Sequence, residues 1–322
     1  MEKLVIGIDI GGINTVFGAV NAKGIIIESR SILTGQYPTA EEFVDVLVSE
    51  LNELIKQVGD KSCFRGIGVG APCGNYYTGC VENTANMSWC KEKTVPLAKM
   101  ITEATGLPTA LTNDANAAAV GEMTYGAAKG MKNFIMITLG TGVGSGIVVN
   151  GQVVYGHDGF AGELGHVIIR RGGRPCGCGR WGCLETYTSA TGVACTAREY
   201  LENDKRDSLL RNDKLEDITS KKVHEAAKQG DPLALDVFEF TGKILGEAFA
   251  DFVTFTGPEA IILFGGLANA EEYIMKPAYK YMEANILSLY KGKTKLLRSQ
   301  LKESDAAVLG ASALGWEIKE NS

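Results

Sequence analysis

The sequence predicts a mixed α/β protein built from two related halves. Short apolar runs at residues 4–10 and 134–139 have the length of buried strands, and each ends at glycines. Apolar residues at helical spacing fill residues 40–58. The order of apolar strand, glycine loop and hairpin occurs twice, at residues 4–29 and 134–155. We therefore expect two α/β halves that face one another across a cleft.

The first half is predicted to follow the order β-β-β-α-β-α. Asn21 to Gly24 form the turn of a hairpin, because glycine adopts a positive φ at little cost. Gly106 and Pro108 end the second helix, as expected of helix stop signals. After the first strand, the expected elements are strands at 15–20 and 25–29, a helix at 40–58, a strand at 64–70 and a helix at 95–105.

The second half begins after a short strand that ends near Thr112. Asn150-Gly151 is a strong hairpin signal, and a third apolar strand runs into Gly265-Gly266. The charged stretch at 198–231 is interpreted as a solvated helical face and its loops. The other expected elements are helices at 114–125 and 305–316, strands at 134–139 and 260–264, and mostly helical chain from Glu185 onward.

Composition excludes several classes of protein. The 322 residues carry 32 Lys and Arg against 38 Asp and Glu, a net charge of −6. This acidic balance argues against broad binding of nucleic acid or anionic lipid. No apolar run approaches the ~18 residues of a membrane span, and the start of the chain does not resemble a secretory leader. We expect a cytoplasmic protein in which the eight cysteines stay reduced, so clustered cysteines indicate metal before disulfides.

Two glycine loops have the residues of a phosphate site. Asp9 ends a strand before Gly11-Gly12, so backbone N–H groups can bind an anion while the carboxylate holds Mg²⁺ through water. Thr141-Gly142 repeats the pattern with a hydroxyl. One such loop alone is better explained as a tight turn. Three loops at strand ends, Gly265-Gly266 included, favour a nucleotide held between the halves, although neither the Rossmann nor the P-loop spacing is present.

His166, Cys176, Cys178 and Cys183 lie within 18 positions and predict a structural zinc site. One imidazole and three thiolates form a closed tetrahedral ligand set, which leaves no open position for catalysis. Buried cysteines beside an unrelated histidine are the weaker alternative.

Two carboxylates, Glu163 and Glu185, flank the cluster, and the ring nitrogen of His166 that does not face the metal is free for a hydrogen bond. Carboxylates and an imidazole suit a polyhydroxyl ligand. The nearby arginines at 170, 171, 174 and 180 would also suit a nucleic-acid-binding zinc module, but the net negative charge of the chain disfavours this alternative.

Asn113-Asp114 opens a helix directly after a strand. Helix capping is the ordinary role of such residues. A carboxylate at this junction would also point into the mouth of a cleft, and the small residues behind it would hold it rigid. Asp114 is therefore the candidate general base.

These motifs together resemble the ROK family (repressors, open reading frames and kinases). The resemblance rests on Asp9-Ile10-Gly11-Gly12, Asn113-Asp114-Ala115-Asn116, Leu139 to Gly144 and above all the run from Gly162 to Glu185, and it covers residues 5 to about 315. It implies an actin-like ATPase (ribonuclease H-like) fold of two α/β domains flanking a cleft, with ATP-dependent phosphorylation of a hexose at its 6-hydroxyl. The domains would be 1–115 with about 303–322, and 116–302 with the zinc loop at 166–183.

The resemblance also implies roles for single residues. Asp114 would take the proton from the sugar 6-hydroxyl, and Asp9 would organise Mg²⁺. The sugar would be bound by Asn86, Asn113, Glu163, His166 and Glu185. ATP would be held by Gly11, Gly12, Asn14, Thr141 and Gly142 at the phosphates and by Gly265 and Gly266 at the adenosine. The zinc ligands would be His166, Cys176, Cys178 and Cys183.

Two positions depart from the family pattern. Ile13 stands where a threonine usually follows Gly-Gly, so a hydroxyl donor to phosphate is lost, with Thr15 the nearest hydroxyl. Cys73 stands where a glycine often follows Gly70-Ala71-Pro72. The change at Ile13 is expected to weaken ATP binding or alter the preferred phosphoryl donor.

Glucose is the first candidate substrate, with N-acetylglucosamine and N-acetylmannosamine as alternatives; the metal-loop spacing disfavours a fructokinase. The first core strand starts at about Lys3, so we expect no DNA-binding region before it. A homodimer is implied, with no nucleic-acid or membrane partner. The alternative outside the enzymes is a sugar-sensing or nucleic-acid-binding zinc protein without turnover.

Overall fold

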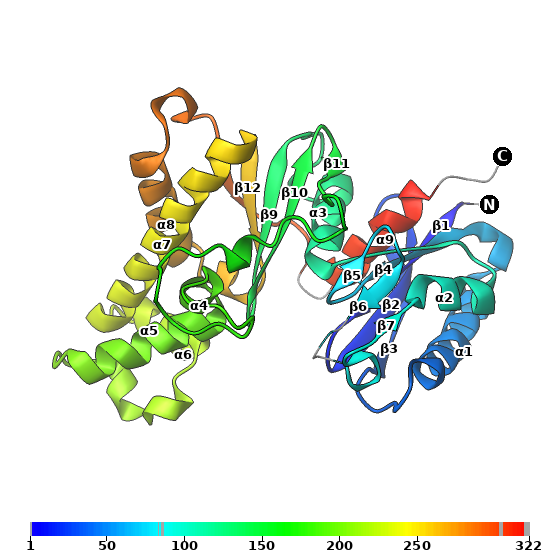
Figure 1. The fold of residues 1–322 in the computed structure, drawn as a ribbon, viewed down its shortest axis with the longest axis horizontal. Coiled ribbons are helices and arrows are strands. Elements are labelled where there is room, and N and C mark those ends of the chain that lie inside the picture. Colours follow the sequence, from blue (N-terminus) through cyan, green and yellow to red (C-terminus); the bar gives the residue numbers. More distant parts are fainter. Residues whose placement is uncertain (1, 83, 85–86, 303–304, 319–322) are drawn as a thin grey trace. The chain divides into compact units, whose positions relative to one another are not determined.

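A computed structural model describes residues 2–82, 84, 87–302 and 305–318 of the chain (Figure 1). The chain forms two compact units. The first contains residues 1–131, 146–162 and 300–322, and the second contains residues 132–145 and 163–299. Helix α3 (Asp114–Tyr125) packs on helix α9 (Ala306–Glu317) inside the first unit.

The first unit contains a five-stranded sheet of order β3-β2-β1-β4-β8. β1–β2 and β2–β3 pair antiparallel, while β1–β4 and β4–β8 pair parallel. Asp9 lies opposite Gly70, and Gly70 lies opposite Thr112, so three strands end at one edge of the sheet. The strands are β1 (Leu4–Ile10), β2 (Asn14–Asn21), β3 (Ile26–Leu33), β4 (Phe64–Gly70) and β8 (Thr109–Thr112).

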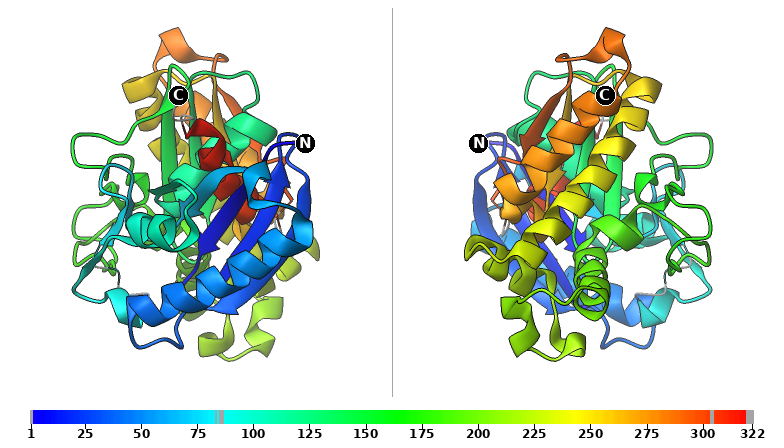
Figure 2. Two further views of the ribbon diagram at one scale, coloured as in Figure 1. Left: turned by 90° about the vertical axis from the view of Figure 1, so that its right-hand side faces the viewer. Right: turned by 90° about the vertical axis from the view of Figure 1, so that its left-hand side faces the viewer.

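Helices cover both faces of this sheet. Ile6 and Ile8 join the core beneath α1 (Ala40–Val58) and α2 (Leu97–Thr105), whereas Val5 packs with Val308 of α9. Alternate residues of a strand point to opposite faces, which explains this split. Figure 2, left, shows α1 lying across its face of the sheet.

Glycines allow α9 to approach the sheet closely. A Cβ added to Gly7 would lie 2.1 Å from the Val308 carbonyl oxygen, and one on Gly68 would lie 1.9 Å from that of Ala311. The glycine surplus of the sequence therefore serves packing as well as loops.

A small three-stranded sheet was not foreseen from the sequence. It consists of β5 (Gly74–Asn75), β6 (Cys80–Glu82) and β7 (Thr94–Val95), in the order β5-β6-β7. Strands of two or three residues are too short to show an alternating pattern, which explains the omission.

A second five-stranded sheet repeats the strand plan of the first, with β9, β12 and β13 in the second unit and β11 in the first. Its order is β11-β10-β9-β12-β13, so in both sheets the first three strands form a meander and the last two follow in parallel. The predicted repeat of architecture is confirmed, and the turn residues Asn150 and Gly151 have φ of 53° and 78°. The strands are β9 (Phe134–Leu139), β10 (Val143–Val149, which crosses between the units), β11 (Gln152–Val153), β12 (Ala260–Phe264) and β13 (Lys295–Arg298).

The second unit is richer in helix than in strand. Figure 2, right, shows α7 beside α8, where glycines bring the two axes together. A Cβ on Gly246 would lie 2.4 Å from the Ala278 carbonyl oxygen. Every described helix is too short or too polar to span a lipid bilayer. The helices are α4 (Glu185–Thr188), α5 (Ala190–Asn203), α6 (Ser220–Lys228), α7 (Pro232–Thr256) and α8 (Glu272–Asn285).

Candidate functional site

Two carboxylates of the first unit flank Gly70 at the end of β4. A Cβ added to Gly70 would lie 3.8 Å from Oδ1 of Asp9 and 3.6 Å from Cα of Asp114. Asp9 lies opposite Gly70 in the parallel pairing with β1, and Asp114 begins α3 directly after β8. The carboxyl ends of parallel strands thus bring together two acidic residues that are 105 positions apart in the sequence.

At the start of α3, Asn113 caps the helix and Asp114 is the candidate base. Asn113 is the N-cap residue, and its side chain accepts a hydrogen bond from the Ala115 N–H at 2.8 Å. Oδ1 of Asp114 accepts from the same N–H at 2.9 Å. The second oxygen of Asp114 is not needed for the cap, and part of the residue is exposed to solvent although the surrounding protein desolvates its carboxyl group. A base that must meet a substrate requires this access.

Both carboxyl groups have a raised pKa. For Asp9, burial is the larger cause and the nearby Asp114 charge the second, and together they raise the pKa to about 7. For Asp114, desolvation by the surrounding protein raises the pKa, and backbone hydrogen bonds oppose the shift. Two neighbouring carboxyl groups repel one another when both are ionised, so a bound cation would stabilise their charged forms.

The loop that follows β1 exposes an apolar side chain. Gly11 N–H donates to the Asn14 carbonyl oxygen at 2.9 Å, and Thr34 N–H donates to that of Ile13 at 2.8 Å. The Ile13 side chain is 75% exposed. Thr15, the nearest hydroxyl in the sequence, is buried and hydrogen-bonded to the Thr34 hydroxyl at 2.8 Å. Thr15 therefore does not replace the hydroxyl that Ile13 lacks.

In the second unit, a carboxylate from α4 supports the equivalent loop. Val143 N–H donates to Oε2 of Glu185 at 3.4 Å, and a Cβ on Gly142 would lie 2.9 Å from the same oxygen. Thr191 donates its hydroxyl hydrogen to the Thr141 carbonyl oxygen at 3.0 Å. Gly265, with φ of 98°, lies against the end of β9, where a Cβ would be 2.7 Å from the Leu139 carbonyl oxygen.

The four predicted metal ligands come together. The donor atoms of His166, Cys176, Cys178 and Cys183 all lie within 4.8 Å of one another. The Sγ atoms of Cys178 and Cys183 are 3.7 Å apart, and Cys176 Sγ is 3.6 Å from His166 Nδ1. A zinc tetrahedron with Zn–S bonds of about 2.3 Å has sulfur–sulfur edges of about 3.8 Å. The donor set and its spacing therefore fit a zinc ion, with His166 facing it through Nδ1.

A short β-ribbon holds the cluster. Ile168 bridges to Cys183, and Pro175 bridges to Trp181. Gly182 is required at this point, because it has φ of 84° and a Cβ would lie 1.7 Å from the Arg170 carbonyl oxygen.

Glu185 links the cluster to the glycine loop. Its Oε1 is 2.9 Å from Cys176 Sγ and 3.6 Å from His166 Nδ1, while Oε2 reaches Val143. One carboxylate thus contacts two motifs that the sequence analysis treated separately.

Glu163 and His166 bracket a single 3₁₀ turn packed on β10. Leu164 N–H donates to the Ser145 hydroxyl at 3.0 Å, and a Cβ on Gly165 would lie 2.0 Å from the Val143 carbonyl oxygen. Asn86, the remaining residue predicted to bind sugar, lies outside the described residues.

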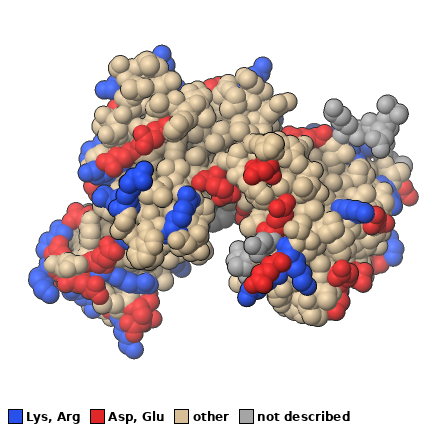
Figure 3. All heavy atoms as spheres, in the orientation of Figure 1, with Lys and Arg blue, Asp and Glu red and all other residues tan. Residues whose placement is uncertain are grey.

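Two of the arginines near the cluster, Arg174 and Arg180, have structural partners. Arg174 is 12% exposed, pairs with Glu199 at 2.6 Å and lies over the Tyr187 ring at 4.6 Å. Arg180 donates to the His166 carbonyl oxygen at 2.8 Å. Acidic and basic side chains are interspersed on the face shown in Figure 3. Both observations weigh against a nucleic-acid-binding zinc module. The contacts of Arg174 could not be predicted from the sequence, because they join residues that are far apart in the chain.

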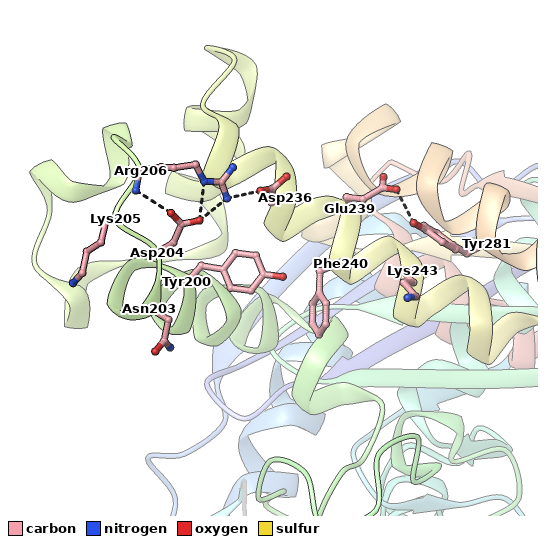
Figure 4. Close-up of a pocket in the computed structure, with 10 residues that line it drawn as sticks. All are labelled: Tyr200, Asn203, Asp204, Lys205, Arg206, Asp236, Glu239, Phe240, Lys243 and Tyr281. Carbon is pink, nitrogen blue, oxygen red and sulfur yellow. Dashed lines mark hydrogen bonds and ion pairs between the residues drawn. The ribbon is translucent and has the colours of Figure 1, made fainter.

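Two pockets lie within the second unit. One of about 390 Å³ is lined by Thr141, Cys176 and Glu185 among others, and so joins the glycine loop to the cluster. The other, of about 650 Å³, contains none of the predicted site residues (Figure 4). There Arg206 pairs with Asp204 and Asp236, each at 2.6 Å. Three of the charged side chains that line this larger pocket are thus paired with one another.

Two five-stranded sheets of the same strand order, packed with helices, are the architecture of the actin-like ATPase fold. The chain belongs to the ROK family, whose model matches residues 5–317.

Similar proteins include the glucokinase of Halalkalibacterium halodurans, which is 36% identical over 99% of this chain and 96% of that protein. The glucokinase of Thermotoga maritima is 32% identical over 99% of both chains. Among solved structures, a ROK family glucokinase from Streptomyces griseus in complex with glucose and AMPPNP has a TM-score of 0.80 at 31% identity, covering 98% of this chain and 100% of that one.

Proposed function

We propose that this protein transfers the γ-phosphoryl group of ATP to the 6-hydroxyl of a hexose, with glucose as the preferred sugar. The observation that carries the proposal is the pair of carboxylates, Asp9 and Asp114, on either side of Gly70. The full-length similarity to glucokinases from several bacteria supports glucose over other hexoses.

Asp114 is the general base of the proposed reaction. Desolvation raises the pKa of Asp114, which makes its carboxylate a stronger proton acceptor than a free one, and its capping bond through Oδ1 fixes its orientation. Positioning of the 6-hydroxyl and stabilisation of phosphoryl charge supply most of the remaining rate enhancement. Asp9, whose pKa is raised first by burial and second by the Asp114 charge, is the residue that would hold Mg²⁺; when bound, this ion neutralises phosphate charge.

The other roles follow the motifs. Thr141, Gly142 and the 11–14 loop would bind the phosphates, and Gly265 and Gly266 would approach the adenosine. Asn113, Glu163, His166, Glu185 and Asn86 would bind sugar hydroxyls. His166 supports this role, because its Nδ1 faces the thiols and leaves Nε2 for a ligand.

A structural zinc ion is part of the proposal. His166, Cys176, Cys178 and Cys183 would hold it, and the bound metal would fix the segment that carries Glu163 and Glu185. Reduced thiols are needed for this site, and a cytoplasmic setting stays a prediction. A homodimer is likewise proposed, and light scattering after size-exclusion chromatography would measure the mass against the 34.4 kDa of one chain.

The deciding experiment is a coupled ATP/ADP assay with glucose, N-acetylglucosamine and N-acetylmannosamine. Higher kcat/KM with glucose supports the proposal, and a product phosphorylated at the 6-position must be found by NMR. Preference for an N-acetylated sugar would replace glucose as the substrate. Sugar binding by calorimetry with no turnover on any sugar would instead indicate a sensor.

A further inference from the structure

Within the first unit, a loop directly before Glu163 is held by contacts with residues 75–77. Residues 155–161 close on themselves, because the Ala161 N–H donates to the Tyr155 carbonyl oxygen at 3.1 Å. Gly156 and Gly159 have φ of 75° and 93°, so the backbone makes sharp turns that glycine tolerates. We refer to this segment as the 155–161 loop.

Asn75 provides the first attachment. The side chain of Asn75 is buried and uses both of its ends. Oδ1 accepts hydrogen bonds from the N–H groups of Tyr77 at 3.0 Å and Thr78 at 3.3 Å, which shapes its own turn. Nδ2 donates to the Asp158 carbonyl oxygen at 2.7 Å, within the 155–161 loop. Asn75 therefore joins two segments that are 83 positions apart.

Aromatic rings provide the second attachment. The rings of Tyr76 and Tyr155 stack with centroids 4.0 Å apart and planes within 3° of parallel. Tyr77 meets Tyr155 edge-on at 6.1 Å, and its hydroxyl donates to the Gly156 carbonyl oxygen at 2.8 Å. Three consecutive residues, Asn75 to Tyr77, thus bind the loop by hydrogen bonds and by stacking. We call residues 75–77 with the 155–161 loop the clasp.

The 155–161 loop of the clasp lies directly before Glu163 in the chain. Gly162 is the last residue of this stretch of the first unit, and Glu163 is the first residue of the next stretch of the second. Only Gly162, with φ of 95°, separates the fastened loop from Glu163. A carboxylate that binds a sugar must be held within a fraction of an ångström, and the clasp fixes the chain immediately before it.

We propose that Asn75 and Tyr76 are positioning residues, which hold the 155–161 loop so that Glu163 meets the sugar. This inference rests on the proposed function, because it needs Glu163 to bind substrate. The expected signature of such residues is a loss of sugar affinity with little change in turnover, since contacts to hydroxyls that do not react bind ground state and transition state alike.

Two substitutions test the clasp. Asn75→Asp keeps the acceptor for the turn and removes the donor to Asp158, while Tyr76→Ala removes the stack. Each is expected to raise the KM for glucose about fivefold, and the pair at least about tenfold, with kcat and the KM for ATP within about twofold of wild type. Tyr76→Phe should restore the wild-type KM, because the stack needs only the ring.

Thr78→Ala is the matched control. It removes hydrogen bonds to Glu82 and Cys80 in the same turn but has no described contact with the 155–161 loop. A double variant with the wild-type KM for glucose would overturn the inference and leave the proposed function intact. If the wild-type protein phosphorylates no sugar, the proposed function fails, and calorimetric sugar binding by the same variants still decides on the clasp.

Discussion

The two five-stranded sheets share a strand order, but the functional carboxylates near them are positioned in different ways. In the first, Asp9 belongs to the central strand β1, and Asp114 is the second residue after β8, which is separated from β1 by β4. In the second, the corresponding loop after β9 has no acidic residue. Glu185 of α4 reaches this loop and accepts a hydrogen bond from the Val143 N–H, 42 positions away in the sequence.

This difference shows how one architecture supports two kinds of site. The acidic residues of the first unit depend on a rigid sheet edge, while those of the second depend on a ribbon with little regular structure beyond two β-bridges. A ribbon without a core of its own needs another source of rigidity, and the Cys/His cluster can supply it. Substitutions in the first unit should therefore affect chemistry and donor binding, and loss of metal in the second should affect sugar binding.

The largest expected effect is at Asp114. Asp114→Asn should lower kcat by ~10²-fold or more while sugar affinity and zinc content stay unchanged, because the amide cannot accept the proton. Steady-state kinetics and calorimetry measure the two quantities. Asp45→Asn, at an exposed position of α1, is the control. Near-normal turnover in Asp114→Asn would remove it as the base.

Loss of metal should act through the second unit. Cys178→Ser, at the exposed ligand, is expected to abolish stoichiometric zinc and raise the KM for sugar about tenfold or more before the whole chain unfolds. Elemental analysis and kinetics provide the readout, with Cys195→Ser as a control thiol outside the cluster. Wild-type protein that contains no metal yet binds sugar normally would refute the prediction.

The raised pKa of Asp9 predicts a pH-dependent stability. Between its ordinary value of 3.8 and the value of about 7 in the folded protein, Asp9 holds a proton when folded and releases it when unfolded. Its contribution to stability is therefore fully present below about pH 4 and is lost as the pH rises through about 7.

The free energy of unfolding, measured with urea in the absence of Mg²⁺, should fall between pH 5 and pH 8. This fall should be smaller for Asp9→Asn than for the wild type. An equal loss in both proteins would contradict the assignment. Asp45→Asn should retain the wild-type change.

Ile13 allows a gain of function in the first loop. Ile13→Thr restores a hydroxyl at a side chain that is 75% exposed, and it is expected to lower the KM for ATP about three- to tenfold. Ile13→Val removes one methylene without adding a hydroxyl and should leave the KM near that of wild type. Equal KM values for ATP in the threonine and valine variants would show that the threonine hydroxyl does not reach the phosphates of ATP.

The smallest expected effect concerns Cys73. This residue has φ of 53°, a left-handed conformation that costs a side chain about 1–2 kcal/mol. Cys73→Gly should relieve that strain and, after the entropy that glycine loses, raise the free energy of unfolding by about 0.5–1 kcal/mol. Cys73→Ala keeps the strain and should not stabilise. Urea denaturation distinguishes the two variants.

Much of the architecture was predictable because its signals are local. Apolar runs with glycine stops placed β1, β9 and β12 within a residue of their bounds, and capping residues placed α3. The short strands β5 to β7 carry no periodic signal. β13, of four residues, was also missed because only Leu296 and Leu297 in it are apolar.

The sequence by itself determined the ligand set and the acidic residues, because metal-binding side chains and strand-end motifs are recognisable from type and spacing. Only the tertiary structure decided which of them meet. It brought Asp114 beside Gly70, buried the hydroxyl of Thr15, gave Glu185 contacts with both the cluster and the glycine loop, and fastened the 155–161 loop to Asn75. Such contacts join residues tens of positions apart, and they depend on how sheets and helices pack rather than on any local pattern.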